Sequence, residues 1–487
     1  MAAQSGWSFD NSYARLPEML FTRVNPVAVK EPRMVVLNRP LSRQLGLDLS
    51  GLDESERAAL FSGTVLPEGS EPLAQAYAGH QFGHFTMLGD GRAIVLGEQI
   101  TPDERRVDIQ FKGSGRTPYS RSGDGKAVLG PMLREYVISE AMHALGISTT
   151  RSLAVVTTGE PVFREGMEPG AILTRVAASH LRVGTFQYVT MRGEHDVLRQ
   201  LVDYALERHY PERIDQGNPA QTLLRGVMER QVDLITEWLR VGFIHGVMNT
   251  DNCSICGETI DYGPCAFMDS YDTATVFSSI DHQGRYAFGN QPAIAQWNCT
   301  RFAEALLPLL HDKQETAIEI ATEILNDFSP RFEKSWLAMM RRKLGLFGVE
   351  EGDADLINGL LDWMTAQKAD YTRTFRALAE NEGIPETSLY QEEVFLHWHR
   401  SWQQRRERQT SERSASQACM CAANPAAIPR NHMVEEALGA AMEKSDLSPL
   451  HALLDALSAP YEDRLELVPY QQPPGPGAAR YQTFCGT

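Results

Sequence analysis

The spacing of apolar residues changes near residue 194, and this change constrains the fold more than any other feature of the sequence. Before it, short stretches rich in Val, Ile, Leu and Phe have the length and composition of β-strands. After it, apolar residues recur at i, i+3 and i+4 in segments such as 195–210 and 223–242, which is typical of amphipathic helices. The chain is therefore predicted to be an α+β protein with a β-rich N-terminal half and an α-rich C-terminal half.

Strands in the first half are expected at residues 84–88, 93–96, 107–111, 153–157 and 171–176. Gly89-Asp90-Gly91 lies between the first two of these strands and predicts a hairpin turn. A helix is expected from Pro131 to Gly146, because proline suits the first helical position and glycine a helix end. Residues 1–70, which are interrupted by prolines, are expected to form an irregular extension with short helices.

The charge balance excludes some classes of function. Among 487 residues, 63 are acidic and 46 basic, which gives a formal net charge of −17. A field of that sign repels phosphate backbones and disfavours nucleic-acid binding as the main role. Every apolar run is shorter than the roughly 20 residues of a membrane span, and the N-terminus lacks a basic start followed by an apolar stretch. A cytoplasmic protein with no membrane or nucleic-acid partner is expected, with about three domain-sized units or two lobes with insertions.

The seven cysteines include two close pairs, Cys253-x-x-Cys256 and Cys419-x-Cys421. The two pairs lie too far apart in the sequence for a compact zinc motif. Free reduced thiols are favoured over a structural or redox link, which stays open as the alternative.

Candidate chemical residues occur in an informative order. The order is a glycine turn (Gly89-x-Gly91-Arg92), a lysine that ends a strand (Lys112), a glutamate on the next helix (Glu135), the segment from His245 to Asn252, and Asp261-Tyr-Gly. Each element alone is most simply a hairpin, a solvated side chain or a turn. Protein kinases, however, use the same order for a phosphate-covering hairpin, a phosphate-binding lysine, its glutamate partner and two metal ligands.

The residue types suit this chemistry. Lys112 near apolar strands needs a carboxylate such as Glu135 to hold it. Asn252 and Asp261 offer oxygen ligands, which suit a hard cation that bridges phosphates.

The slot of the kinase catalytic base differs. That position, five residues before the metal-binding asparagine, is Val247, which cannot accept a proton. Asp251 is the neighbouring carboxylate and the obvious substitute.

The distribution of cations is also unusual. Asp90 lies in the glycine turn, where an anion would repel phosphates, whereas Arg175 and Arg182 belong to one short segment that can bring two guanidiniums together. With other basic residues around 113–126, they suggest a pocket for an extended polyphosphate tail. A triphosphate held by its far end would expose a different phosphorus to attack.

Several longer stretches resemble the selenoprotein O family, whose bacterial members are the YdiU proteins. These stretches are residues 75–83, 110–120, 121–126, 246–252, 258–267, 281–286 and 428–432. The resemblance covers nearly the whole chain.

The resemblance implies a protein-kinase-like pseudokinase that transfers AMP from ATP, bound in a flipped orientation, to Ser, Thr or Tyr hydroxyls of proteins. By resemblance, Asp251 accepts the proton, and Asn252 and Asp261 hold Mg²⁺ or Mn²⁺. The residues implied to contact the nucleotide or to position those that do are Gly89, Gly91, Arg92, Lys112, Asp124, Gly125, Glu135, Arg175 and Arg182. Some relatives carry selenocysteine near the C-terminus, where this chain has Cys485, either a redox-sensitive thiol or an exposed terminal one.

The sequence thus predicts a two-lobed, kinase-like fold. Its expected parts are an N-terminal extension (1–70), a kinase-like N-lobe (71–190), a helical C-lobe (191–470) and a tail with Cys485 (471–487). Three alternatives to AMP transfer stay open: γ-phosphoryl transfer, Mn²⁺-dependent transfer of UMP, and a non-catalytic nucleotide-binding scaffold. The sequence names neither the protein substrates nor the oligomeric state.

Overall fold

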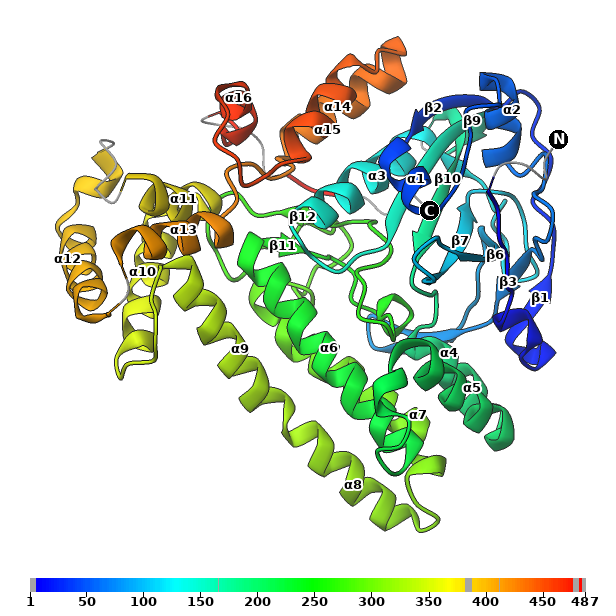
Figure 1. Cartoon of the computed structure of the whole chain (residues 1–487), viewed down its shortest axis with the longest axis horizontal. Coiled ribbons are helices and arrows are strands. Elements are labelled where there is room, and N and C mark those ends of the chain that lie inside the picture. The colour runs from blue at the N-terminus through cyan, green and yellow to red at the C-terminus, as the bar shows by residue number, and fades with distance from the viewer. Residues whose placement is uncertain (1–5, 165, 382–387, 411, 476–480, 484–487) are drawn as a thin grey trace.

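Figure 1 shows the computed structural model, in which a β-sheet lies at one end of an elongated molecule and a group of helices at the other. The structure describes residues 6–164, 166–381, 388–410, 412–475 and 481–483. Cys485 lies outside these residues.

Eight strands of the described chain form one sheet, all of whose pairings are antiparallel. The order is β1-β3-β6-β7-β10-β9-β2, and β8 pairs with β10 off this path. The strands are β1 (Phe21–Arg23), β2 (Arg33–Leu37), β3 (Leu73–Gln75), β6 (Ala93–Ile100), β7 (Arg106–Lys112), β8 (Ala127–Val128), β9 (Arg151–Phe163) and β10 (Met167–Ala177). The α+β prediction is confirmed.

The N-terminal segment is more ordered than the predicted irregular extension. It supplies both ends of the sheet path, β1 beside β3 and β2 beside β9. It also supplies α1 (Arg39–Gln44) and α2 (Glu54–Phe61). The prolines interrupt the segment without preventing pairing, because strands at a sheet edge need hydrogen bonds on one side only.

The two faces of the sheet have different covers. Val107, Ile109 and Phe111 of β7 pack in a cluster with apolar residues of α1 and α2. On the other face lies α3 (Leu129–Ala144), which packs against β9 and β10. This helix confirms the predicted one, although it begins two residues before Pro131.

The predicted hairpin about Gly89-Asp90-Gly91 is wrong. Instead, β5 (His84–Met87) pairs with β4 (Ala78–Gln81) in a separate two-stranded sheet, and β6 pairs with β7 and β3. The glycines serve close packing, because a Cβ on Gly89 would overlap the ring of Tyr119 and one on Gly91 would crowd the Tyr119 carbonyl. The stretch is therefore a connection pressed against residues 117–120.

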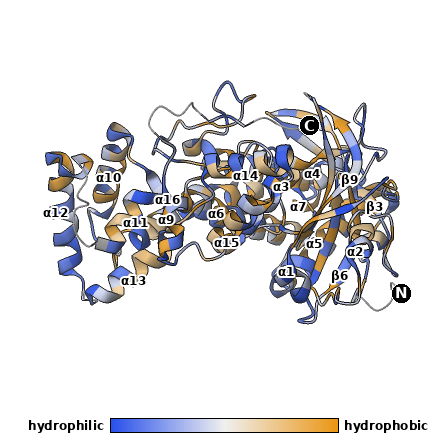
Figure 2. Cartoon of the chain, turned by 90° about the horizontal axis from the view of Figure 1, so that it is seen from above, coloured by the Kyte–Doolittle hydropathy of each residue, from blue (hydrophilic) through white to orange (hydrophobic). Residues whose placement is uncertain are grey.

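The remainder of the described chain is mainly helical (Figure 2), which confirms the predicted change of character. A short ladder of β11 (Phe243–Ile244) and β12 (Ala266–Phe267) flanks a loop that contains the 3-10 turn η5 (Thr250–Asn252). The helices are α4 (Val183–Thr190), α5 (His195–His209), α6 (Pro219–Val241), α7 (Gln291–Leu310), α8 (Gln314–Asn326), α9 (Phe328–Lys343), α10 (Asp353–Gln367), α11 (Tyr371–Asn381), α12 (Glu393–Arg408), α13 (Arg413–Ala423), α14 (Asn431–Lys444), α15 (Ser448–Leu457) and α16 (Val468–Gln471).

Across the described ranges, every helix is too short or too polar to cross a lipid bilayer. The division into lobes and the boundaries at residues 70, 190 and 470 stay predictions.

Candidate active site

The site is built on the polar face of β7. Strand alternation places Asp108, Gln110 and Lys112 on the face opposite the apolar cluster with α1 and α2. All three side chains are buried, so each needs a partner. The neighbouring strand β10 brings Arg175 opposite Gln110, and the guanidinium donates to the Gln110 amide oxygen at 3.1 Å.

Glu135 of α3 joins the two cations. Lys112 Nζ lies 2.7 Å from Glu135 Oε2, and Arg175 Nε lies 2.8 Å from Glu135 Oε1. Burial alone would raise the pKa of Glu135, but the charges of Arg175 and Lys112 lower it below its usual range. The expected pairing of Lys112 with Glu135 is present, and Arg175 shares the same carboxylate.

Asp261, which is distant from Lys112 and Arg175 in the sequence, contacts the same two cations. Its Oδ1 accepts from Lys112 Nζ at 3.0 Å and from Arg175 Nη2 at 2.7 Å. Burial opposes ionisation, yet Arg175, Lys112 and Arg182 hold the pKa of Asp261 well below its usual range. The backbone at Asp261 has φ +63°, a left-handed conformation that is uncommon outside glycine. Asp261 keeps 24% of its side chain exposed, so this ionised carboxylate borders open space.

Arg182 completes the cationic group. Its guanidinium lies over the Tyr77 ring at 4.3 Å, 3.6 Å from Asp90 Oδ1 and 3.8 Å from Asp261 Oδ2. Asp90 is buried and accepts from the Gln75 backbone N–H at 3.1 Å. The carboxylate of Asp90 therefore lies beside Arg182 inside the protein. The predicted convergence of Arg175 and Arg182 is present.

Asp251 in η5 is the most isolated carboxyl of the site. It is 8% exposed, and its Oδ1 is buried with no hydrogen-bond partner among the described residues. Among the described residues, the one side-chain bond that its Oδ2 accepts is long, 3.4 Å, from the Gln81 amide. Burial raises the pKa of Asp251 to about 6. A carboxylate of this kind is suited to accept a proton near neutral pH.

The β4–β5 hairpin covers Asp251, which sequence reasoning missed. A Cβ on Gly79 would overlap Asp251 Oδ1, so glycine is needed where the hairpin crosses the carboxylate. Gln81, two residues on, lies on the same face of β4. Gly79 was the only signal of this close approach in the sequence.

Asn252 and Asp261 fit a divalent cation by their donor atoms. The Asn252 side-chain amide donates to the Val247 carbonyl at 2.9 Å, so its oxygen is the atom it can offer to a ligand. Asp261 Oδ2 lies 3.8 Å from Arg182 Nη1, which is within ion-pair range but beyond hydrogen-bond distance. These oxygens suit Mg²⁺ or Mn²⁺.

The remaining predicted nucleotide residues lie on connections around Lys112. Arg92 precedes Ala93, which pairs with Lys112, and the Arg92 carbonyl accepts from the Gly113 N–H at 2.7 Å. Asp124 is half-exposed and bonded to Arg164 at 3.0 Å, and Gly125 packs on Gly115. Gly89 and Gly91 lie against residues 119–120. Contact of these residues with a nucleotide stays a prediction.

The cysteines of the described chain all carry free thiols, as the sequence favoured. Cys253 and Cys256 are buried, and burial raises the pKa of each thiol to about 12. Both side chains are therefore protonated near neutral pH.

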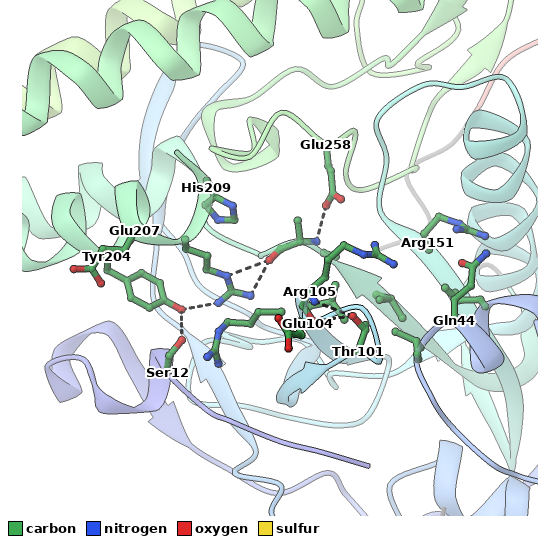
Figure 3. A pocket seen from close by; sticks show the side chains of 18 of the residues that line it. Ser12, Gln44, Thr101, Glu104, Arg105, Arg151, Tyr204, Glu207, His209 and Glu258 are labelled. Atoms are coloured by element: carbon green, nitrogen blue, oxygen red, sulfur yellow. Dashed lines mark hydrogen bonds between the residues drawn. The ribbon is translucent and has the colours of Figure 1, made fainter. Parts of the chain in front are cut away.

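A cavity of about 680 Å³ lies at the opposite end of β7, among the N-terminal segment, the β6–β7 connection and α5. Figure 3 shows Tyr204, His209 and Glu258 around it. It contains none of the predicted catalytic, nucleotide-binding or metal residues, so this cavity and the candidate chemistry do not coincide.

Comparison with known proteins agrees with the resemblance seen in the sequence. Residues 5–458 match the family described as "Protein adenylyltransferase SelO". The chain is similar to "Protein nucleotidyltransferase YdiU" of Nitrosococcus oceani, with 61% identity over 99% of this chain and 98% of that protein. The corresponding proteins of Syntrophotalea carbinolica and Alcanivorax borkumensis are 60% and 57% identical, over 99% and 100% of this chain and 98% and 100% of their own lengths.

Proposed function

Because this chain belongs to the SelO family of protein adenylyltransferases, we propose that it transfers AMP from ATP to Ser, Thr or Tyr hydroxyls of other proteins. The chain is a protein nucleotidyltransferase, and the choice of AMP, of these hydroxyls and of a kinase-like two-lobed arrangement is the proposal. The observation that carries it is Asp251, a buried carboxylate with no ion-pair partner among the described residues, near a cluster of three cations. Besides the effect of burial, the charge of Arg182 lowers the pKa of Asp251 and the charge of Asp261 raises it.

In the proposed reaction, the hydroxyl oxygen of the acceptor attacks the α-phosphorus of ATP. The bond from that phosphorus to the oxygen that bridges to the β-phosphorus breaks, and pyrophosphate leaves. Asp251 takes the hydroxyl proton, because Val247 in the usual slot of the base cannot. The N–H groups of Lys112, Arg175 and Arg182 stabilise charge on the phosphates.

Glu135 has a positioning role. Its two oxygens hold Lys112 and Arg175 side by side, so both cations face Asp261 before the nucleotide arrives. Fixed cations of this kind stabilise developing charge without reorganisation. A divalent ion at Asn252 and Asp261 would neutralise phosphate charge when bound.

The cations support the flipped orientation of ATP. Arg175 and Arg182 add two guanidiniums beside Lys112, enough to hold the far end of a polyphosphate. The α-phosphorus would then be the one that faces Asp251.

Mass spectrometry of the protein and of added acceptor proteins, after incubation with ATP and Mg²⁺ or Mn²⁺, tests the proposal. We expect an added adenylate mass, with label transferred from α-labelled but not γ-labelled ATP, and none from the Asp251→Ala variant. Transfer of γ-label would overturn AMP transfer in favour of a phosphotransferase. A uridylate mass from UTP but no adenylate mass from ATP would favour the UMP alternative.

A further inference from the structure

The hairpin that covers Asp251 also presents a surface outside the nucleotide site. Its first strand carries Gly79 and Gln81 toward Asp251, and the opposite face of the hairpin carries His80 with its cross-strand neighbour Phe85. The rings of His80 and Phe85 are in edge contact at 5.2 Å. One face of the hairpin therefore covers the carboxylate, and the other face is available for a different contact.

The hairpin is fixed to the loop that carries Asp251. The His80 N–H donates to Thr250 Oγ1 at 2.7 Å, and the Phe82 N–H donates to Asn249 Oδ1 at 3.0 Å. Tyr286 donates to the same Asn249 oxygen at 2.7 Å. Because the two residues that precede Asp251 are held this way, anything bound to the hairpin lies at a set distance from the carboxylate.

The β5 half of this outer face is apolar and exposed, whereas Ala78 on the β4 half is buried. Phe85 is 37% exposed and Met87 42% exposed, two residues apart on one face of β5. Trp297 of α7 extends this face, with its ring 5.4 Å from that of His80. Within the described ranges, β5 has a strand on one edge only, β4. An exposed apolar face beside an open strand edge is a common feature of sites for extended peptides.

Arg285 gives this surface a positive charge. Its guanidinium stacks on Trp297 at 4.7 Å, and its Nε and Nη2 are buried without a hydrogen-bond acceptor in the described structure. Gly83, at the tip of the hairpin, lies close to the same guanidinium. Besides burial, the charges of Arg301 and Arg285 lower the pKa of His80, so the field here is positive. An acidic side chain would supply the acceptor that Arg285 lacks.

We propose that the outer face of the β4–β5 hairpin, with Trp297 and Arg285, is the docking surface for the acceptor polypeptide. The occupant is an extended segment that runs along β5, places an apolar side chain on Phe85 and Met87, and places an acidic side chain on Arg285. The tethers between the hairpin and η5 set the spacing from these two anchors to the hydroxyl at Asp251. This inference rests on the proposed function and names the substrate class of the same site.

Peptide acceptors provide the test. The probes are serine peptides in which the flanking positions carry Glu and Leu, Lys and Leu, Glu and Ala, or Lys and Ala, and the readout is transfer of label from α-labelled ATP. For the wild type we expect the Glu and Leu peptide to have the highest kcat/KM. Arg285→Ala and the double variant Phe85→Ala, Met87→Ala should each lower kcat/KM for that peptide by about tenfold, mainly through KM.

Two controls separate docking from folding and from nucleotide binding. Phe163→Ala removes a similarly exposed aromatic at the β9–β10 hairpin, where Phe163 is 69% exposed, and should leave all four peptides unchanged. Affinity for a non-hydrolysable ATP analogue should be the same in every variant. Arg285→Glu should reverse the charge preference, so that the Lys and Leu peptide becomes the better acceptor.

The failure of this inference differs from that of the proposed function. A wild type that transfers AMP to all four peptides equally, or variants that keep the wild-type preference, would overturn the docking surface alone. A wild type that transfers no AMP to any protein or peptide would overturn both.

Discussion

The two ends of β7 carry similar side chains but differ in what those side chains leave free. At the Asp108 end, Arg208 of α5 lies 2.5 Å from Asp108 Oδ1 and 3.0 Å from Glu98 Oε2, and also donates to the Ala178 carbonyl at 2.7 Å. The backbone and ring nitrogens of His180 occupy the second oxygen of Asp108. Burial lowers the pKa of His180, so its ring is neutral near pH 7.

At the Lys112 end the pairing is incomplete. The hydrogen bonds that Asp261 accepts from Lys112 and Arg175 both fall on Oδ1, and within the described chain Asp251 keeps a buried oxygen with no partner. Both ends are buried clusters of ion pairs, so the presence of ion pairs does not distinguish one end from the other. Spare carboxylate oxygens at one end mark it as the end that binds something, whereas at the other end both Asp108 oxygens are bonded and join β7 to α5.

The same substitution at each end gives the largest test of this comparison. Asp261→Asn keeps the size of the side chain but removes the charge that Lys112, Arg175 and Arg182 face. We expect kcat to fall by about 10²–10³-fold or more. Stability should change less, because Glu135 still pairs with Lys112 and Arg175. Rates of AMP transfer and urea unfolding curves measure the two effects, and a normal rate would remove Asp261 from the reaction.

Asp108→Asn should show the opposite balance. It leaves Arg208 buried with a weaker partner and should lower the free energy of unfolding by about 3–5 kcal/mol. AMP transfer per folded molecule should be unchanged, because Asp108 lies at the far end of β7. Calorimetry measures the change in stability. Titration with the ATP analogue gives the fraction of active protein, by which the rate of AMP transfer is divided. If the loss appeared in kcat with stability intact, the two ends would not be functionally distinct.

The pH dependence of AMP transfer tests Asp251 next. A base must be ionised, and burial raises the pKa of Asp251 to about 6. The rate should therefore be level above pH 6 and fall about tenfold for each pH unit below it. In Asp251→Asn the residual rate should lose this dependence. A wild-type profile that stays flat down to pH 5 would exclude Asp251 as the proton acceptor.

The smallest expected effect is a change in thermal stability on substitution of Glu258, which lines the cavity at the Asp108 end. Its Oε2 accepts from the Ala178 N–H at 3.0 Å, and burial raises its pKa from 4.5 to about 7. The folded state therefore binds this proton more tightly, and its stabilising effect is lost as pH rises from about 4.5 to 7. Glu258→Gln should raise the Tm by about 1–3 °C at pH 8 relative to pH 5, as measured by differential scanning fluorimetry. Equal shifts at both pH values would contradict the raised pKa.

Much of the architecture follows from local patterns. The α3 helix, the strands around residues 107–111, 153–157 and 171–176, and the helical second half all have the periodicity of their observed structure. The pairing of Lys112 with Glu135 was predictable because a cation on a buried strand requires a carboxylate nearby. The prediction of a hairpin at Gly89 is wrong because glycine occurs at sites of close packing as well as in turns, and the sequence does not distinguish the two.

Sequence by itself determined which residues offer charge, and tertiary structure decided which of these charges stay uncompensated. The alternation Val107-Asp-Ile-Gln-Phe-Lys112 is that of a strand with one solvated face, yet both faces are buried. Whether a polar side chain on that face is paired depends on Arg208 and Asp261. Both lie far from β7 in the sequence but close to it in the folded chain. The cost of burying a charge is set by its neighbours in space, and local sequence does not contain them.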